Sequence, residues 1–175
     1  MADASIWTTK EIVTAVISTG VITAFLSPVL TWLADFVRSR TRQKHARTYL
    51  CMKVASILES YAIECAELVD ASIAHYGQTQ IPTTFSLPDP PAYPQDVDWH
   101  SLDAGTAYRA MSFLNECEAQ AASARYANHF EGNPFEAEEA AKRTGRKAHE
   151  LANVFREKAD LQPPDLGHML QSLLK

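Results

Sequence analysis

An unbroken run of uncharged residues near the N-terminus constrains the fold of this chain more than any other feature. It extends from Ile12 to Ala34, and its 23 residues include no Asp, Glu, Lys or Arg. As an α-helix rising 1.5 Å per residue it would measure about 34 Å, enough to cross a hydrocarbon core of roughly 30 Å. We therefore expect a transmembrane helix over residues 12–37, preceded by a short tail over residues 1–11.

Two other structures would also account for the apolar run. A cleaved secretory signal normally begins with positive residues and ends at small ones, whereas Asp3 and Glu11 precede this run and Trp32 lies near its end. A buried core helix would accommodate the six hydroxyl-bearing residues that dilute its apolar character. The length and the lack of charge favour the membrane span. The six residues are Thr14, Ser18, Thr19, Thr23, Ser27 and Thr31.

Five cationic residues follow the apolar run, and we call residues 38–47 the basic collar. Before the run the only positive groups are Lys10 and the terminal amine. Cationic side chains resist translocation and are attracted by the anionic cytoplasmic leaflet of the bilayer. We therefore expect a single-pass protein of the plasma membrane, with its N-terminus outside and its C-terminal domain in the cytoplasm. The cationic residues of the collar are Arg38, Arg40, Arg42, Lys44 and Arg47.

The charge of the remaining chain argues against nucleic acid as the target of the collar. The whole chain carries a net charge of −5, and residues 48–175 contain ten Lys or Arg against eighteen Asp or Glu. Phosphate binding requires a positive surface, which a domain with this acidic excess does not offer. We expect the lipid bilayer, and no nucleic acid, as the partner of the collar.

Small residues recur at every fourth position within the predicted span. Residues four apart lie almost above one another on a helix, so they would form a ridge that a second membrane helix can approach closely. In the alternative interpretation each hydroxyl bonds the carbonyl four residues earlier and needs no partner. The candidate helix contact, which we call the small-residue ridge, consists of Ala15, Thr19, Thr23, Ser27 and Thr31.

A helical bundle domain is predicted for residues 48–175. No Gly or Pro occurs between Val29 and Tyr76, so the membrane helix is expected to continue through the collar into the first helix of the bundle. That helix is expected to end at Gly77 with a left-handed cap. Its apolar seam, in steps of four and three, comprises Leu50, Val54, Ile57, Tyr61, Leu68 and Ala71, widened by Leu58, Cys65, Val69 and Ile73.

A proline-rich segment over residues 77–102 is expected to be an extended crossover, because it holds five of the nine prolines. It would return the chain to the other end of the first helix. Pro90, Pro91 and Tyr93 match the Pro-Pro-x-Tyr pattern that WW domains bind, although a rigid, partly docked loop is the simpler interpretation. The apolar residues expected to hold this loop on the helices are Phe85, Leu87, Tyr93 and Trp99.

Two further helices are predicted after the crossover. Asp103 would cap a helix that runs to about Phe130, and Asn133 with Pro134 would start another that runs to about Leu161. Their short connection requires an antiparallel hairpin. The facing stripes would be Ala110, Phe113, Leu114, Cys117, Ala121 and Ala124 on one helix and Ala137, Ala141, Thr144, Ala148, Leu151, Phe155 and Ala159 on the other. We therefore expect an all-α protein in which an N-terminal transmembrane helix precedes an antiparallel three-helix bundle.

A leucine-rich C-terminal segment follows Pro163 and Pro164, which are expected to end the third helix. Asp165 would cap a short final helix with one apolar face. That face must either close the bundle or bind a partner. The candidate partner face consists of Leu166, Met169, Leu170, Leu173 and Leu174.

The sequence offers no recognisable reaction chemistry. Its six histidines are isolated and its six glycines are never closely spaced, so the common zinc-protease and nucleotide-binding motifs are missing. The three cysteines form no Cys-x-x-Cys pair and are expected to be reduced core residues. We predict no catalytic residue, no metal site, no cofactor and no small-molecule substrate.

The function expected from these features is that of a membrane-anchored helical interaction or regulatory protein without enzymatic activity. It would bind a protein partner or form a homo-oligomer. Anchoring raises the effective concentration at the membrane, so modest contacts suffice. A pore-forming or lysis protein whose small-residue ridge lines an opening is one alternative, and an enzyme on a helical scaffold is another.

Overall fold

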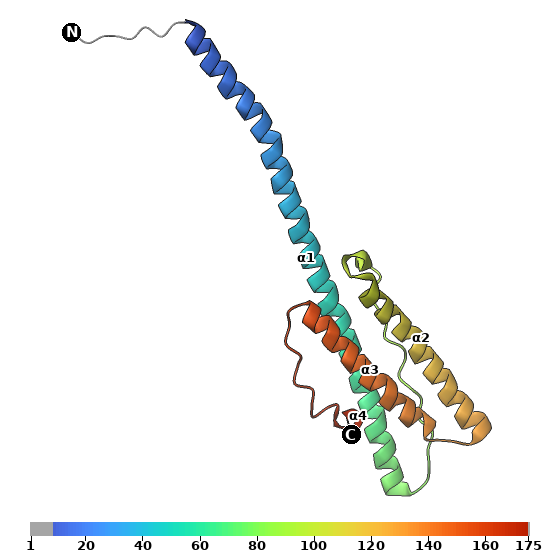
Figure 1. Cartoon of the computed structure of the whole chain (residues 1–175). Helices are drawn as coiled ribbons and strands as arrows, with labels where there is room; N and C mark the ends of the chain where they lie inside the picture. The colour runs from blue at the N-terminus through green and yellow to red at the C-terminus, as the bar shows by residue number, and fades with distance from the viewer. Residues whose placement is uncertain (1–8, 175) are drawn as a thin grey trace. The chain divides into compact units, whose positions relative to one another are not determined.

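Every regular element in the described part of the chain is a helix (Figure 1). The computed structural model describes the backbone of residues 9–174 and the side chains of Phe36 and of residues 38–174. The chain divides into two units, Met1–Lys44 and His45–Lys175. For the described residues the predicted all-α class is therefore confirmed.

The longest element is α1, which spans Thr9–Thr79 and contains 71 residues. It confirms the prediction that one helix continues from the apolar run through the basic collar into the bundle. The expected cap at Gly77 is wrong: α1 continues for two residues more, and Gln80 adopts the left-handed φ of 54°. Its amide donates to the carbonyl of Tyr76 at 2.9 Å, which satisfies one of the last free carbonyls of the helix.

The side chains of residues 12–34, including the small-residue ridge, lie outside the described residues. Among the residues that are described, no helical stretch combines the length and the apolarity needed to cross a bilayer.

One broad face of α1 forms a wall of the core in the unit His45–Lys175. The predicted seam is wrong at its end, because Ala71 and Ile73 are exposed. The last buried residue of this face is Ser72, whose hydroxyl donates to Glu138 in the first turn of α3 (Glu136–Lys158). The face is wider than a heptad seam because two helices pack on it. Its buried residues include Leu50, Cys51, Val54, Ala55, Leu58, Tyr61, Ala62, Cys65, Ala66, Leu68 and Val69.

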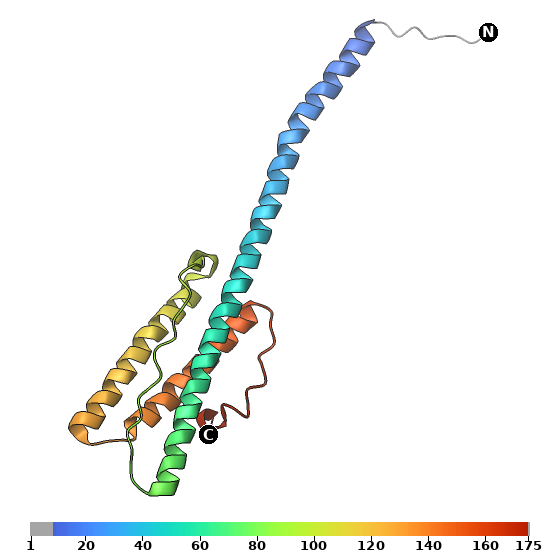
Figure 2. The same cartoon turned by 180° about the vertical axis from the view of Figure 1, so that it is seen from behind.

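The segment after α1 is extended, as its prolines predict, and Figures 1 and 2 show it running back along the bundle. It ends in the short 3-10 helix η1, Trp99–Ser101. The side chains of Phe85, Tyr93 and Trp99 pack against the main core, and Leu87 packs against a smaller cluster. The predicted docking of this crossover is confirmed.

The second long helix is α2, Ala104–Tyr126, and its predicted cap is confirmed. Asp103 accepts hydrogen bonds at 2.9 Å from both the amide and the hydroxyl of Thr106. The helix continues directly into η2, a π-helical turn over Ala127–Glu131. Gly132 then reverses the chain with a φ of 64°, a conformation that costs glycine little because it has no Cβ.

The third helix, α3, begins at Glu136, three residues after the predicted cap. Asn133 caps nothing in α3: its carboxamide oxygen accepts from the amide of Phe135 at 3.1 Å and closes a local turn. The first turn of α3 is acidic, with Glu136, Glu138 and Glu139 at the positive end of the helix dipole.

The three helices meet around Tyr61, and α3 runs antiparallel to α2 (Figure 1). The Tyr61 ring meets the edge of Phe113 on α2 at a centroid distance of 5.9 Å, and its hydroxyl donates to Thr144 on α3 at 3.3 Å. The predicted stripe on α3 is buried in full, whereas Leu114 and Ala121 on α2 are half-buried. The buried residues of the α2 stripe are Ala110, Phe113, Cys117 and Ala124.

The C-terminal segment turns back along the bundle and ends in α4, Gln171–Leu174. Leu170 and Leu173 are buried in the main core, with 1% and 0% of their surface exposed. These two leucines therefore close the bundle. Met169 and Leu174 remain exposed, and Leu166 is half-buried.

Candidate interaction surfaces

The side of α2 that faces away from the core carries an exposed, largely apolar stripe. Tyr108 is 73% exposed, Tyr126 57% and Phe130 70%. The stripe follows steps of three and four residues, so its members lie nearly in line along the helix. Aromatic residues stand near its two ends and small residues between them. We call this stripe the outer face of α2; it consists of Tyr108, Met111, Asn115, Ala119, Ala122, Tyr126 and Phe130.

At the C-terminal end of α2, aromatic side chains of this face contact one another at the π-helical turn. The rings of Tyr126 and Phe130 are 4.8 Å apart, and His129 meets the edge of Phe130 at 5.0 Å. A π-turn widens the helix by one residue and displaces its side chains from ordinary α-helical positions. Phe130 lies in this turn with its side chain exposed.

A second exposed aromatic contact joins the end of α1 to the start of α3. The rings of Tyr76 and Phe135 meet edge to face at 5.6 Å, and both side chains are more than a third exposed. Ile73 and Ile81 are exposed nearby in the sequence. Such contacts stabilise the junction by about 0.5–1.5 kcal/mol beyond the area that they bury.

The basic collar presents its charges to solvent in the described structure. Arg38, Arg40, Arg42 and Lys44 are exposed, and Arg47 is half-buried. The guanidinium of Arg40 lies 4.5 Å from the centre of the Phe36 ring, a distance at which a cation is attracted to the ring face.

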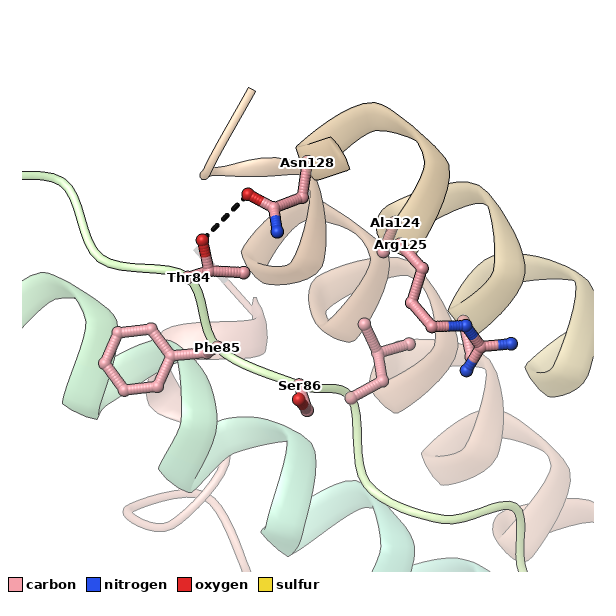
Figure 3. A pocket seen from close by; sticks show the side chains of 8 residues that line it. Thr84, Phe85, Ser86, Ala124, Arg125 and Asn128 are labelled. Carbon is pink, nitrogen blue, oxygen red and sulfur yellow. Dashed lines mark hydrogen bonds between the residues drawn. The ribbon is translucent and has the colours of Figure 1, made fainter. Parts of the chain in front are cut away.

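A small cavity lies where the crossover passes over the end of α2 (Figure 3). Its volume is about 140 Å³, well below that of ordinary ligand pockets. The hydroxyl of Thr84 donates to the side-chain oxygen of Asn128 at 2.8 Å and ties the crossover to η2. On the other side of the crossover Phe85 points toward α1, where its ring lies 6.3 Å from that of His75. The cavity therefore lies within the contact between the crossover and the helices, and it is too small for an ordinary ligand.

The Pro-Pro-x-Tyr pattern is built into the bundle surface. Pro91 is buried, and the Tyr93 ring lies 5.6 Å from that of Trp99 and packs against the core. A WW domain must enclose both the proline turn and the tyrosine. In this structure these residues form a loop that is docked on the bundle.

The C-terminal segment fits a notch between α1 and α3 that depends on Gly145. A Cβ atom at this position would stand 2.7 Å from Leu173 Cδ1 and 2.8 Å from Cys65 Cβ. The Nε of Arg146 donates to the carbonyl of Leu173, and the Ser172 hydroxyl donates to the carbonyl of Ala66 at 3.4 Å. The notch therefore holds the segment by shape and by hydrogen bonds to its last turn.

A buried polar cluster lies at the centre of the bundle. The hydroxyl of Thr144 donates to the carbonyl of Ala140 at 2.9 Å, accepts from Tyr61, and lies 3.8 Å from the Cys65 sulfur. Burial raises the pKa of the Cys65 and Cys117 thiols to about 11 and moves the pKa of Tyr61 well above its ordinary value. All three groups stay neutral near pH 7, so the cluster offers no nucleophile.

One ion pair in the bundle is largely withdrawn from solvent. Both nitrogens of the Arg156 fork donate to the carboxylate of Glu59, the Nη2–Oε2 distance being 2.7 Å. The two side chains are 20% and 10% exposed. The hydrogen bonds that Arg156 donates to the carboxylate of Glu59 raise the pKa of Arg156. A pair of this geometry joins α1 to α3 at a single register.

The sequence did not reveal the two features that the structure makes most prominent. The sequence analysis missed the outer face of α2 because α2 carries apolar residues on both its buried and its exposed side, so the pattern does not show a second, exposed stripe. The notch was missed because an isolated Gly145 within a helix gives no signal of close approach. The predicted sites fall into three groups: the ridge lies outside the described residues, the collar is exposed, and the candidate partner face is divided between core and surface.

Within the described residues, no group of three or more His, Cys, Asp or Glu side chains is arranged to hold a metal ion. Comparison with known protein families, with curated proteins and with solved structures finds no match for this chain.

Proposed function

We propose that the chain is a single-pass protein of the plasma membrane whose cytoplasmic helical domain acts by binding another protein, not by catalysis. The observation that carries this proposal is the uncharged run Ile12–Ala34, which belongs to a helix that continues into the basic collar. Only a helix or a closed barrel satisfies the backbone inside lipid. A continuous helix of this composition meets that requirement.

The exposed cations of the collar support the proposed orientation. Each Lys or Arg close to an anionic leaflet contributes about 1 kcal/mol of attraction. The four exposed cations between residues 38 and 44 would together hold this part of α1 at the cytoplasmic surface.

Membrane extraction tests the anchor. Full-length protein is expected to stay in the pellet after a carbonate wash. The double variant Ile17→Asp and Val21→Asp is expected to appear in the supernatant, because each central carboxylate costs about 2.5–3.5 kcal/mol in a membrane helix. Ile17→Ala with Val21→Ala is the matched control and is expected to stay in the pellet. Release of the unaltered chain by carbonate would disprove the anchor.

Protease accessibility tests the orientation in sealed vesicles with the cytoplasmic side inside. The helical domain is expected to be protected until detergent is added. Replacing Arg38, Arg40, Arg42 and Lys44 with Gln is expected to give a mixed orientation, with part of the domain digested. Digestion of the unaltered domain in intact vesicles would contradict the cytoplasmic assignment.

The outer face of α2 supports the interaction part of the proposal, and the partner that fits it is an amphipathic helix. Ala119 and Ala122 are small enough to let a second backbone approach closely. Tyr108 and Tyr126 would flank that helix, and aromatic anchors of this kind contribute most of the energy in many interfaces.

Site-directed photocrosslinking in intact membranes tests this surface. A photoreactive residue at position 122 is expected to give one discrete adduct with a partner protein. The adduct should disappear when Tyr126→Ser and Phe130→Ser are added, and persist when Ile81→Ser, which alters an exposed residue elsewhere, is added instead. An adduct that survives the first pair, or equal labelling from position 143 on α3, would rule out the outer face.

A further inference from the structure

The small cavity between the crossover and the end of α2 is lined by hydrogen-bond donors and carries one positive charge. Its polar lining consists of Arg125 from α2, Asn128 from η2, and Thr84 and Ser86 from the crossover. No Asp or Glu is among the described residues that line it. Arg125 is exposed and forms no ion pair within the described part of the chain. This lining suits a negatively charged group.

Thr84 sets the direction of the Asn128 amide. The Thr84 hydroxyl donates to the side-chain oxygen of Asn128 at 2.8 Å, so that oxygen is already engaged. Figure 3 shows the nitrogen of the same amide on the side away from Thr84, facing the space between the crossover and α2. A carboxamide nitrogen carries two N–H donors. Asn128 thus presents donors, and not its acceptor oxygen, to an occupant of the cavity.

The size and the charge of the cavity together select a carboxylate. Its volume is about 140 Å³, and an engineered cavity of about 150 Å³ binds benzene, so the end of one acidic side chain fits. A guanidinium binds a carboxylate through two parallel hydrogen bonds, and the two charges balance. A phosphate group carries a charge of about −1.5 to −2, which a single cation leaves uncompensated. The C-terminal end of a helix dipole is negative, so Arg125 must supply the whole attraction.

The cavity lies beside the outer face of α2. Arg125 directly precedes Tyr126, a member of that face, and successive residues of an α-helix are about 100° apart around its axis. Ala121, which also lines the cavity, directly precedes Ala122 of the same face. A helix packed along the outer face therefore passes close to Arg125, and an acidic side chain on its edge can reach the cavity.

We propose that this cavity binds the carboxylate of an Asp or Glu side chain on the partner helix that packs against the outer face of α2. Arg125 forms a bidentate ion pair with that carboxylate, and the Asn128 amide and the Ser86 hydroxyl donate further hydrogen bonds to it. The apolar stripe supplies contact area, and the cavity fixes the register of the partner helix. The partner helix rests on the proposed function, whereas the affinity of the cavity for a carboxylate does not.

Titration of the full-length protein with sodium acetate in detergent micelles tests the cavity by itself. The side-chain amide signals of Asn128 in NMR spectra are expected to shift and to saturate with acetate. Sodium chloride at equal ionic strength, which screens charges to the same extent, is expected to shift them little. Equal shifts with the two salts would overturn the proposal, and so would tighter binding of inorganic phosphate than of acetate.

Three variants assign the acetate binding to the residues of the cavity. Arg125→Gln is expected to weaken it about ten-fold, because a hydrogen-bonded charge pair is lost. Thr84→Val leaves the Asn128 amide able to turn and is expected to weaken it several-fold. Arg109→Gln removes an exposed charge elsewhere on α2 and is the matched control, which should bind acetate as the unaltered chain does. Unchanged affinity in Arg125→Gln would overturn the proposal.

Photocrosslinking from position 122 in intact membranes tests the source of the carboxylate. Arg125→Gln is expected to reduce the adduct with the partner several-fold, and Arg109→Gln to leave it unchanged. An adduct that Arg125→Gln does not diminish would show that the partner makes no use of the cavity, and would overturn this inference while the proposed function stands. No adduct from a chain that keeps Arg125 would instead contradict the proposed function and with it the partner helix, and the acetate titration would still decide whether the cavity binds a carboxylate.

Discussion

Alanine in place of Gly145 is expected to destabilise the bundle, although the same change normally stabilises a helix. In an exposed helix interior, Gly→Ala contributes about 0.8–1.0 kcal/mol of helix propensity. At this position the new Cβ would stand 2.7 Å from Leu173 Cδ1 and 2.8 Å from Cys65 Cβ. Both atoms belong to fully buried side chains, so neither can move away freely.

The magnitude follows from the balance of these two effects. Overpacking a well-filled core costs about 1–3 kcal/mol, and the gain in helix propensity offsets roughly 1 kcal/mol of that. We therefore expect Gly145→Ala to lower the free energy of unfolding by up to about 2 kcal/mol. At a typical urea dependence of 1–3 kcal/mol per molar, the midpoint would fall by about 1 M.

Gly105 supplies the matched control, because it lies in the first turn of α2 with free space around it. A Cβ there would meet only the Asp103 carboxylate, at an ordinary 3.5 Å. Gly105→Ala is expected to raise the urea midpoint. Opposite signs for the two variants in the same urea titration are the result that supports the argument.

A double variant locates the cause of the effect. Leu173→Ala removes the side chain that the new Cβ would meet and costs about 2–5 kcal/mol by itself. The combined loss for Gly145→Ala with Leu173→Ala is expected to be smaller than the sum of the two single losses, with a coupling of about 1 kcal/mol. A stabilised Gly145→Ala protein, or strict additivity, would refute the tight fit of the C-terminal segment.

Two further predictions concern the buried polar groups. Arg156→Met leaves the Glu59 carboxylate, which is 10% exposed, without its partner, and we expect it to lower the free energy of unfolding in urea by about 3–5 kcal/mol. Adding Glu59→Leu to this variant should restore most of that free energy, because the unpaired buried charge is removed. If the second substitution restores none of it, the two residues do not act as a pair. Burial raises the pKa of the Cys65 and Cys117 thiols from 9.0 to about 11, so the neutral thiols stabilise the folded state fully below pH 9. That contribution, on the order of 2 kcal/mol per thiol, should be lost between pH 9 and pH 11 as the unfolded chain ionises. Thermal unfolding across this range, with Cys65→Ala and Cys117→Ala as references, measures the loss, and a flat profile would contradict it.

Local signals in the sequence predicted the helices well because their causes are local. Asp103 caps α2 as expected, since its carboxylate needs only the amides of the next turn. Asn133 misled the prediction because Pro134 and Phe135 allow a turn that uses the same side-chain oxygen. Asp103 and Asn133 are both typical of helix starts. Only the path of the following backbone determines that the first caps a helix and the second closes a turn.

Contacts between distant segments could not be predicted in this way. Glu59 and Arg156 are 97 residues apart, and each is ordinary for an exposed helix position. Their pairing depends on the register between α1 and α3, which a sequence pattern does not specify. The crossover was easier, because an aromatic residue such as Trp99 loses much by exposure wherever the bundle surface lies.

Polar contacts, and not the small side chains packed between the helices, determine the register of α1 against α3. Ala62, Ala66, Ala141 and Ala148 present nearly smooth surfaces, so apolar packing alone would tolerate sliding by one turn. Three directional contacts at successive levels remove that freedom: Glu59 with Arg156, Tyr61 with Thr144, and Ser72 with Glu138. A shift of one turn, about 5.4 Å, would break all three and leave a carboxylate and two hydroxyls in the core. Because each such loss costs more than the packing gained elsewhere, these pairs fix the single arrangement in which the notch at Gly145 faces Cys65.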